Sequence, residues 1–323
     1  MRRFVFVGVE THGSSIRAIF PAWRDRLELD DDVSLDGVDI PVGAPPDRYR
    51  KVVETLLADS SFLGALVTTH KVAIYEAAHD LFAEVDHFAR LCGEVSCLAK
   101  RDGKLLGWAK DPITASRSLD DLLGPLYFEQ SGGDVLCLGA GGAGTAIILC
   151  LMTRAAVSDM PGRIVVADAV PARLDAVRRL HRELEATVPL VCHATGSPAE
   201  LDQLLAALPP RSVVINATGM GKDRPGSPLS ENALFPQGAI VWDLNYRGAL
   251  DFLHQAQAQA TVRSLRVEDG WRYFIFGWTS VIEEVFQRPI SADEIEILAT
   301  DADFARPLRA SVRAGDGTSG SSA

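Results

Sequence analysis

The stretch VLCLGAGGAGTAIILCLM, residues 135–152, decides the fold of this chain. It begins with a short apolar run typical of a buried strand, and residues 143–153 have the pattern of a helix. Between the two, Gly139, Gly141 and Gly144 have the spacing G-x-G-x-x-G. In a βα unit these glycines make a tight turn, admit a pyrophosphate and allow close helix–strand packing, while the helix N-terminus offers free N–H groups. The stretch predicts a dinucleotide-binding loop; a glycine-rich structural turn is the alternative.

Strands and helices alternate downstream of this loop. Strands are expected at residues 134–138, 163–167, 190–193, 213–216, 240–244 and 263–267. Helices are expected at residues 143–153, 171–185, 198–207 and 250–259. Strands that alternate with helices of about 10–15 residues imply a parallel sheet with right-handed crossovers. The predicted fold class is therefore α/β, with a Rossmann-type doubly wound parallel sheet in residues 116–270.

Asp168 ends the strand that follows the glycine loop, and this position bears on the choice of cofactor. A carboxylate there accepts hydrogen bonds from the adenosine ribose hydroxyls and repels a 2′-phosphate. The sequence therefore favours NAD over NADP. Arg173 lies one helical turn further along and weakens this preference.

The first 115 residues form a second predicted α/β unit. Strands are expected at residues 3–9, 38–42, 64–68, 95–100 and 104–108, and helices at 15–27, 46–57, 72–82 and 112–123. Ser14 and Ser15 suit the N-cap of the first helix, and Asp102-Gly103 is a strong hairpin signal. Two later helices, at residues 271–286 and 292–304, follow the second unit. Residues 307–323 are rich in Gly and Ser and are expected to be disordered.

Two short apolar runs in the first unit are each followed by a residue that can handle a proton. Lys71 ends GALVTTHK, residues 64–71, and Asp111 lies in GWAKDP, residues 107–112. Hydride transfer from an alcohol carbon needs a base for the hydroxyl proton, and a lysine can serve if burial lowers its pKa toward neutrality. A neighbouring aspartate would orient the ammonium group. Spacing alone leaves an alternative, in which a surface lysine and a hairpin-end aspartate never meet.

Eight short segments follow one another along the chain: THGSS (11–15), LVTTHK (66–71), GEVSC (93–97), GWAKDP (107–112), GAGGAG (139–144), NATGMG (216–221), DLNY (243–246) and EDG (268–270). In this order they resemble the motifs of the shikimate/quinate dehydrogenase family, and the resemblance extends from about residue 4 to residue 289. The family forms of the first four are a His-Ser-x-Ser loop, NVTxPxK, GAVNT and G-x-NTDG. No single segment is decisive, but eight in one order are specific.

This resemblance implies a substrate-binding domain in residues 1–115, completed by returning helices in residues 271–306, and an active site between it and the Rossmann domain. It implies that Lys71 is the catalytic acid and base and that Asp111 is its partner. Substrate contacts are expected from Ser14, Ser15, Thr68, Ser96 and Tyr246. Cofactor contacts are expected from Gly139, Ala140, Gly141, Gly142, Ala143, Gly144, Asp168, Arg173, Asn216, Thr218, Leu244 and Gly270.

Several positions that face the substrate in the family differ in this chain. Leu66 and Ser96 each replace an asparagine, and the glutamine of the returning helix aligns with Gly277. A buried polar group left unpaired costs about 1–3 kcal/mol, so a site without these amides should bind shikimate poorly. Because Lys71 and Asp111 are retained, the pattern predicts the same redox chemistry on another substrate.

Two polar residues beside the pair have open roles. His70 suits either catalysis or a structural contact. Lys110 suits either an anion contact or a solvated hairpin position.

We therefore expect an NAD(P)-dependent oxidoreductase that reversibly oxidises a secondary alcohol. Its substrate would be a cyclic or polyhydroxylated carboxylic acid other than, or in addition to, shikimate. One alternative is shikimate 3-dehydrogenase proper, which reduces 3-dehydroshikimate. A second alternative, from another class, is a non-catalytic nucleotide-binding regulatory protein.

Composition sets the outer limits of these interpretations. Of 323 residues, 47% are hydrophobic and 23% charged, as in soluble globular proteins. The net charge of −11 argues against nucleic acid and acidic membranes as partners and leaves a small molecule. No apolar run approaches the roughly 20 residues of a membrane span, and the first strand is too short for a signal-peptide core. A cytoplasmic monomer or homodimer is expected.

The five cysteines show neither CxxC nor zinc-ligand spacing. We expect buried free thiols and no metal site. The five are Cys92, Cys97, Cys137, Cys150 and Cys192.

Overall fold

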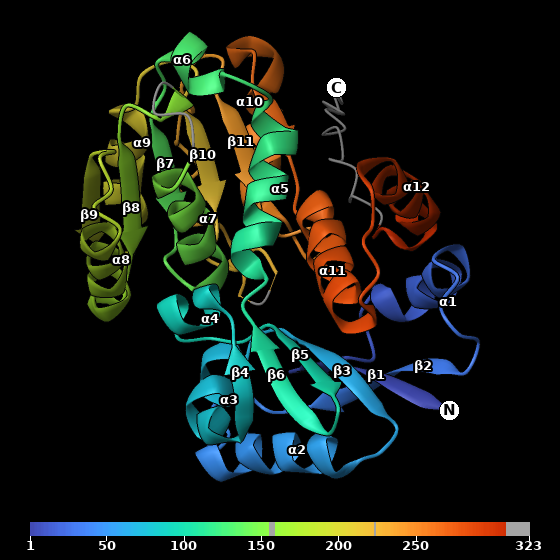
Figure 1. The fold of residues 1–323 in the computed structure, drawn as a ribbon. Coiled ribbons are helices and arrows are strands. Elements are labelled where there is room, and N and C mark those ends of the chain that lie inside the picture. Colours follow the sequence, from blue (N-terminus) through green and yellow to red (C-terminus); the bar gives the residue numbers. More distant parts are fainter. Residues whose placement is uncertain (155–158, 223, 308–323) are drawn as a thin grey trace, which may run out of the picture.

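The computed structural model describes residues 1–154, 159–222 and 224–307, which form two six-stranded sheets with helices around them (Figure 1). The strand orders are β2-β1-β3-β5-β6-β4 and β12-β11-β10-β7-β8-β9. The first sheet lies below the second in Figure 1, and α4 and the start of α5 lie where the two approach each other. The predicted α/β class with two units and a Rossmann-type sheet is confirmed.

The first sheet mixes parallel and antiparallel strands. Its members are β1 (Arg2–Gly8), β2 (Val33–Asp39), β3 (Phe62–Val67), β4 (Phe82–Val85), β5 (Cys97–Arg101) and β6 (Lys104–Trp108). β1 pairs in parallel with β2 and β3, whereas β5 runs antiparallel to β3 and β6. The hairpin expected at Asp102-Gly103 is confirmed. Both residues have positive φ (51° and 74°), which matches the twist that two-residue hairpins favour.

Helices cover both faces of the first sheet because β1 is apolar on both faces. Phe4 and Phe6 point to one side and Val5 and Val7 to the other, as the period of two in a strand requires. The valine side packs on α2 (Pro46–Ala58) and α3 (Lys71–Ala78). The phenylalanine side packs on α1 (Ile16–Arg26), α11 (Trp271–Phe286) and α12 (Ala292–Ala302). The last two helices thus return to the first sheet after the chain has built the second.

The second sheet is parallel throughout. Its strands are β7 (Val135–Leu138), β8 (Ile164–Asp168), β9 (Leu190–Ala194), β10 (Val213–Asn216), β11 (Ile240–Asp243) and β12 (Arg266–Glu268). The chain enters at β7, adds β8 and β9 on one side, and then crosses to add β10, β11 and β12 on the other. The order reverses between β7 and β10, and open α/β sheets bind ligands beyond the carboxyl ends of the strands at such a point.

Helices also cover both faces of this second sheet. Val135 and Cys137 face one cluster, with α5 (Asp111–Leu123), α7 (Gly142–Met152) and α8 (Pro171–Glu183). Leu136 and Leu138 face the other, with α9 (Pro198–Ala206) and α10 (Asp251–Arg263). The sheet is therefore doubly wound, as predicted.

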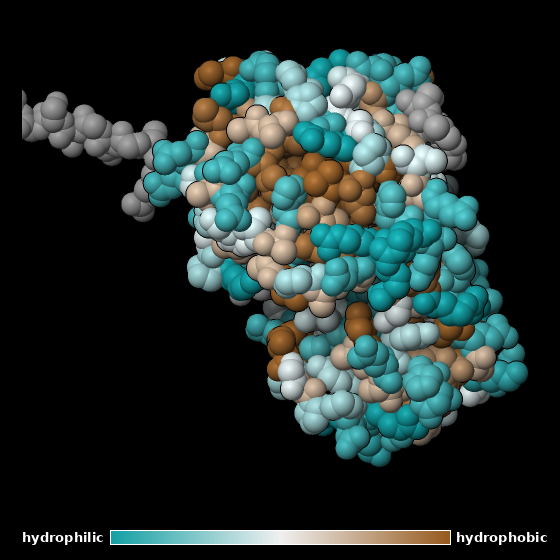
Figure 2. Space-filling model, turned by 90° about the vertical axis from the view of Figure 1, so that its left-hand side faces the viewer, coloured by the Kyte–Doolittle hydropathy of each residue, from teal (hydrophilic) through white to brown (hydrophobic). Residues whose placement is uncertain are grey.

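Figure 2 shows the face on the side of α8 and β9, which is mostly hydrophilic, with apolar residues gathered in one area of its upper part. No helix in residues 1–154, 159–222 or 224–307 is long and apolar enough to cross a membrane.

The structure corrects several predicted elements of the first unit. The strand predicted at residues 38–42 is β2, Val33–Asp39, and the helix predicted to reach residue 82 ends at Ala78. β2 is an edge strand whose polar residues and Gly37 interrupt its alternation, so its pattern is weak. The short elements β4, α4 (His87–Cys92) and α6 (Tyr127–Ser131) were not predicted. Ser15 occupies the N-cap of α1, but its side chain accepts no capping hydrogen bond.

The domain limits at residues 115, 270 and 306 stay predictions. The first of them falls inside the continuous helix α5. The tail prediction for residues 307–323 falls almost wholly outside the described residues.

The cysteines are also only partly as expected. All are free, but only Cys97 and Cys137 are buried, whereas Cys92, Cys150 and Cys192 are partly exposed.

Candidate active site

Lys71 and Asp111 meet because of the strand directions in the first sheet. β3 and β6 are each antiparallel to β5, so they run parallel to one another and end at the same edge. Lys71 opens α3 shortly after β3, and Asp111 opens α5 shortly after β6. The Lys71 ammonium group donates to Asp111 Oδ2, and the two side chains are only 20% and 10% exposed. The alternative in which the two residues never meet is therefore wrong.

The charge state of Lys71 differs from the expectation. Burial by itself lowers the pKa of the ammonium group, but the negative charges of Asp111 and Glu94 outweigh burial and raise the pKa above its ordinary value. The predicted fall toward neutrality is thus not found in this structure. Two carboxylates, rather than the single one expected, explain the difference.

Glu94 is a member of this cluster that the sequence reasoning missed. It lies in the turn before β5, and only 4% of the residue is exposed. Burial and the nearby charge of Asp111 raise the pKa of its carboxyl group to about 7, while Lys71 opposes them. A signal was present, because the family segment GAVNT reads GEVSC here and places a glutamate where the family has alanine.

The glycine loop has the shape that its three glycines imply. Gly139 has φ 99°, and a Cβ there would lie 2.7 Å from the Ala217 carbonyl oxygen. A Cβ on Gly144 would lie 2.1 Å from the Gly139 oxygen, so neither position admits a side chain. A Cβ on Gly141 would meet nothing within 4 Å. The loop thus packs tightly at Gly139 and Gly144 and leaves open space at Gly141, at the N-terminus of α7, where helices offer free N–H groups to anions.

Asp168 holds the edge of this loop through two backbone contacts. The Ala140 N–H donates to its Oδ2 and the Val170 N–H to its Oδ1, both at 2.8 Å. A carboxylate has about four lone-pair sites, so it can still accept ribose hydroxyls. Arg173 Nη1 lies 3.5 Å from Asp168 Oδ2, and its side chain is 52% exposed. The position therefore combines a ribose acceptor with an exposed cation.

The other predicted cofactor residues shape the loops that follow β10 and β11. Asn216 Nδ2 donates to Asp243 Oδ1 (3.0 Å), and Asn216 Oδ1 accepts from the Thr218 N–H and hydroxyl (3.1 and 2.7 Å). A Cβ on Gly270 would lie 1.9 Å from the Leu244 carbonyl oxygen. The side-chain amide of Asn216 is thus fully engaged within the protein.

The predicted substrate residues differ in the contacts that they make within the protein. Thr68 Oγ1 donates weakly to the Val7 carbonyl (3.3 Å). Ser96 Oγ accepts the Lys110 N–H (2.7 Å) and so fixes the turn that presents Asp111. The Tyr246 ring packs on Trp271 and Phe274. The hydroxyls of Ser14 and Ser15 contact no hydrogen-bond partner in the described part of the chain.

Leu66 and Gly277, which stand where the family has amide side chains, carry no polar side chain. Leu66 is 6% exposed and belongs to an apolar cluster with Phe6 and Trp278. A Cβ on Gly277 would come no closer than 3.7 Å to any group, so α11 leaves space beside Thr114. Neither position therefore offers the amide that the family pattern places there.

His70 and Lys110 both have structural partners. His70 is buried, and its Nε2 donates to the Ile40 carbonyl (2.8 Å). Lys110 forms a 2.6 Å ion pair with Glu284 of α11, which Arg101 also contacts at 2.7 Å. The solvated position considered for Lys110 is therefore wrong, because its side chain is only 11% exposed, and the anion contact stays a prediction. The ion pair joins the N-cap of α5 to the returning helix.

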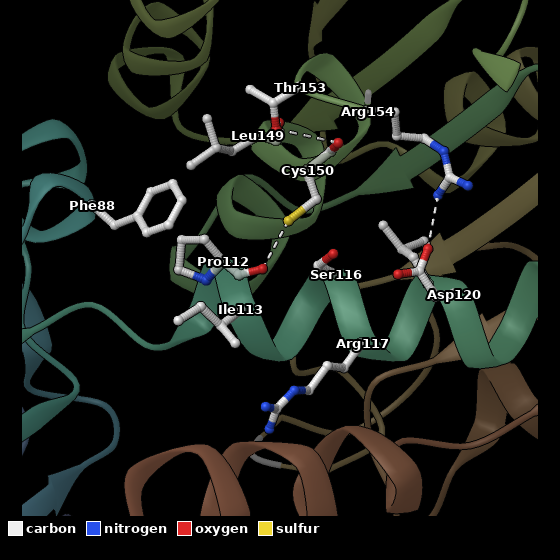
Figure 3. Close-up of a pocket in the computed structure, with 11 residues that line it drawn as sticks. Phe88, Pro112, Ile113, Ser116, Arg117, Asp120, Leu149, Cys150, Thr153 and Arg154 are labelled. Atoms are coloured by element: carbon white, nitrogen blue, oxygen red, sulfur yellow. Dashed lines mark hydrogen bonds and ion pairs between the residues drawn. The ribbon is translucent and has the colours of Figure 1, made fainter. Parts of the chain in front are cut away.

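One pocket in the described part of the chain lies apart from the Lys71–Asp111 pair. It has a volume of about 670 Å³ and lies between α5 and α7, bounded by Phe88 of α4 (Figure 3). Cys150 Sγ contacts the Pro112 carbonyl oxygen at 2.9 Å, and burial raises the pKa of this thiol to about 12. Arg117 points away toward α11, where it pairs with Glu283. The pocket therefore offers no reactive group.

Comparisons with known proteins agree with this geometry. No family model matches the sequence. A curated shikimate dehydrogenase (NADP(+)) of Methylobacterium radiotolerans is 33% identical over 216 residues, which are 66% of this chain and 67% of that protein.

Two solved structures share the fold. The Thermus thermophilus shikimate 5-dehydrogenase in complex with NADP(H) and shikimate has a TM-score of 0.67 at 24% identity, over 94% of this chain and 100% of that one. The Corynebacterium glutamicum quinate dehydrogenase in complex with NAD has a TM-score of 0.69 at 19% identity, over 93% and 98%.

Proposed function

The chain belongs to the shikimate dehydrogenase family of oxidoreductases that act on CH–OH groups, and on that basis we propose that it interconverts a secondary alcohol and a ketone on a cyclic or polyhydroxylated carboxylic acid other than, or in addition to, shikimate. The observation that carries the proposal is the Lys71–Asp111 pair, retained beside an altered, apolar wall at Leu66 and Gly277. Because the proton-handling residues are kept and two residues expected to recognise shikimate are not, a different substrate is favoured.

Each residue of the site has a role in this reaction. A bound nicotinamide dinucleotide would accept or supply the hydride. Lys71, whose raised pKa keeps it an ammonium ion, donates a proton to the ketone oxygen in the reducing direction, and it can take the hydroxyl proton in the oxidising direction only after it has lost its own. Asp111 orients the ammonium group through their hydrogen bond. The loop 139–144 would hold the pyrophosphate of that dinucleotide through the N–H groups at the start of α7. Ser14, Ser15, Thr68 and Tyr246 contact the substrate, whereas Ser96 positions the turn before Asp111.

The altered wall argues against shikimate as the best substrate. A substrate hydroxyl that faces Leu66 would lose its hydrogen bond to water without gaining one from the protein, which costs about 1–3 kcal/mol. Shikimate itself is the second candidate, because the curated relatives carry its name.

For the cofactor we propose a preference for NAD. Asp168 lies at the loop with lone pairs left for ribose hydroxyls, and a carboxylate disfavours a 2′-phosphate. Curated relatives named for NADP(+) support the opposite choice, and Arg173 is the side chain that would permit it.

One assay separates these possibilities. Purified protein is incubated with shikimate, quinate and a panel of cyclic and acyclic hydroxy acids, each with NAD and with NADP. We expect kcat/KM for shikimate to lie at least about 100-fold below that of the best panel member. Efficient NADP-linked turnover of shikimate would instead identify a shikimate 3-dehydrogenase. Binding of NADH without turnover of any compound would favour the regulatory protein.

A further inference from the structure

We propose that Glu94 makes dinucleotide binding proton-linked, because the protein accepts the dinucleotide when this carboxyl group is neutral and disfavours it when the group is ionised. The inference rests on the proposed function in one respect, namely that the glycine loop binds a nicotinamide dinucleotide.

Glu94 is held by backbone hydrogen bonds in the substrate domain and lies against the nucleotide domain. In the substrate domain, the Glu94 N–H donates to the Ala89 carbonyl, and the next N–H, of Val95, donates to the Lys71 carbonyl, both at 3.3 Å. In the nucleotide domain, a Cβ added to Gly142 would lie 3.2 Å from Glu94 Oε2. The carboxyl group therefore lies against the first turn of α7, beside the N–H groups that would receive the pyrophosphate.

Only 4% of Glu94 is exposed, and within residues 1–154, 159–222 and 224–307 no group donates a hydrogen bond to its carboxyl oxygens, which are not fully buried. A carboxyl group so deeply placed almost always has a partner in a folded protein, either a protein group or water. A bound molecule that supplies an acceptor oxygen, such as a phosphate, would give the neutral acid that partner.

The charged and titratable groups around Glu94 come from four helices. Lys71 of α3 and Asp111 of α5 act on it with opposite signs. Cys92 of α4 and Tyr273 of α11 are neutral groups whose own pKa values the charge of Glu94 helps to raise, after burial. Because Asp111 already neutralises Lys71, an ionised Glu94 adds net negative charge beside the helix terminus.

A second anion at this terminus is unfavourable for the first. The helix N-terminus stabilises one negative group, and both the Glu94 carboxylate and the pyrophosphate would compete for it. Burial raises the pKa of Glu94 to about 7, so its charge changes within the physiological range. Dinucleotide binding should therefore be tighter at lower pH, where the acid is neutral, and weaker at higher pH, where the group ionises.

The test measures NADH binding by fluorescence titration between pH 6 and pH 8. NADH is the probe, because the 2′-phosphate of NADPH titrates near pH 6 itself. We expect the Kd to rise about tenfold from pH 6 to pH 8, since one proton with a pKa near 7 is linked to binding. Calorimetry in two buffers of different ionisation enthalpy should show uptake of about half a proton at pH 7 and nearly one at pH 8.

The matched variants are Glu94→Gln and Glu76→Gln. E94Q should bind NADH at pH 8 about as tightly as the unmodified protein does at pH 6, with no pH dependence. E76Q removes the same charge from an exposed position on α3 and should keep the full pH dependence.

Three results would overturn the inference. They are pH-independent NADH binding by the unmodified protein, the same pH dependence in E94Q, and weaker binding by E94Q at every pH, which would make Glu94 a direct ligand in its ionised form. If neither protein binds NADH at any pH, the proposed function fails as well, so the two failures are distinguishable.

Discussion

The glycine loop and the Lys71–Asp111 pair reach their geometry in different ways. The geometry of the loop is local. Gly139 and Gly144 are only five residues apart, and the spacing of the glycines allows the backbone to pack closely at these two positions. The pair is not local, because its members lie 40 residues apart and meet only through the directions of β3, β5 and β6. Local geometry can be disrupted by one added carbon atom, whereas the pair depends on sheet architecture and on the charges around it.

The largest effect is expected at the pair. Lys71→Ala removes the proton-exchanging group, and turnover of the best substrate should fall about 10²- to 10⁴-fold. NADH binding should change far less than turnover, because Lys71 lies outside the loop and acts on it only through the charges of Asp111 and Glu94. Steady-state kinetics and fluorescence titration measure the two properties. Unchanged turnover in K71A would contradict the proposed mechanism.

The next effect concerns the connection between the first sheet and α11. Glu284→Ala leaves Lys110 and Arg101 without their carboxylate, and Lys110 is only 11% exposed. We expect the free energy of unfolding to fall by about 1–3 kcal/mol, because two partly buried donors lose their acceptor, and urea denaturation near pH 7 measures the loss.

The pH dependence of that loss provides its control. Burial raises the pKa of Glu284, but hydrogen bonds from Lys110 and Arg101 outweigh it and lower the pKa. The stabilisation is therefore present above the ordinary glutamate pKa and is lost as pH falls through the lower folded value. The difference between E284A and the unmodified protein should shrink in acid; a constant difference would indicate lost packing instead.

Two glycine variants test the local region. Gly144→Ala places a Cβ 2.1 Å from a backbone oxygen that cannot move freely, so we expect a loss of about 1–3 kcal/mol in unfolding free energy and loss of NADH binding. Gly141→Ala adds the same atom where nothing lies within 4 Å. It should fold with nearly unchanged stability and still bind NADH more weakly. Equal stability of the two variants would show that the loop is not packed as described.

The smallest effect is expected at Arg173. Its exposed guanidinium group lies near Asp168 and is the available partner for a 2′-phosphate. Arg173→Ala should weaken NADPH binding a few-fold and leave NADH binding within about twofold, because a single exposed ion pair contributes about 0.2–1 kcal/mol. An equal loss for both dinucleotides would assign Arg173 to the loop fold.

The positions of the strands could be predicted from the sequence better in the second sheet than in the first. Every strand of the parallel sheet was located to within about three residues. Its central strands β7, β8, β10 and β11 are buried, continuous apolar runs, and these set the frame for the edge strands β9 and β12. In the first sheet the edge strand β2 and the short β4 were misplaced or missed, because partly exposed edge strands carry a weak pattern. The same limit applies to Glu94, which as one letter in a sequence is an ordinary surface glutamate.

The sequence by itself determined the family, the doubly wound sheet, the glycine loop and the residues Lys71 and Asp111, because each depends on local patterns or on the order of short segments. Only the tertiary structure decided the charge of the site. It placed Glu94 beside the pair, kept Lys71 as an ammonium ion and engaged Lys110 with Glu284. The physical reason is that pKa values depend on burial and on charges a few ångströms away in space, and neither quantity is a property of the neighbouring residues in the chain.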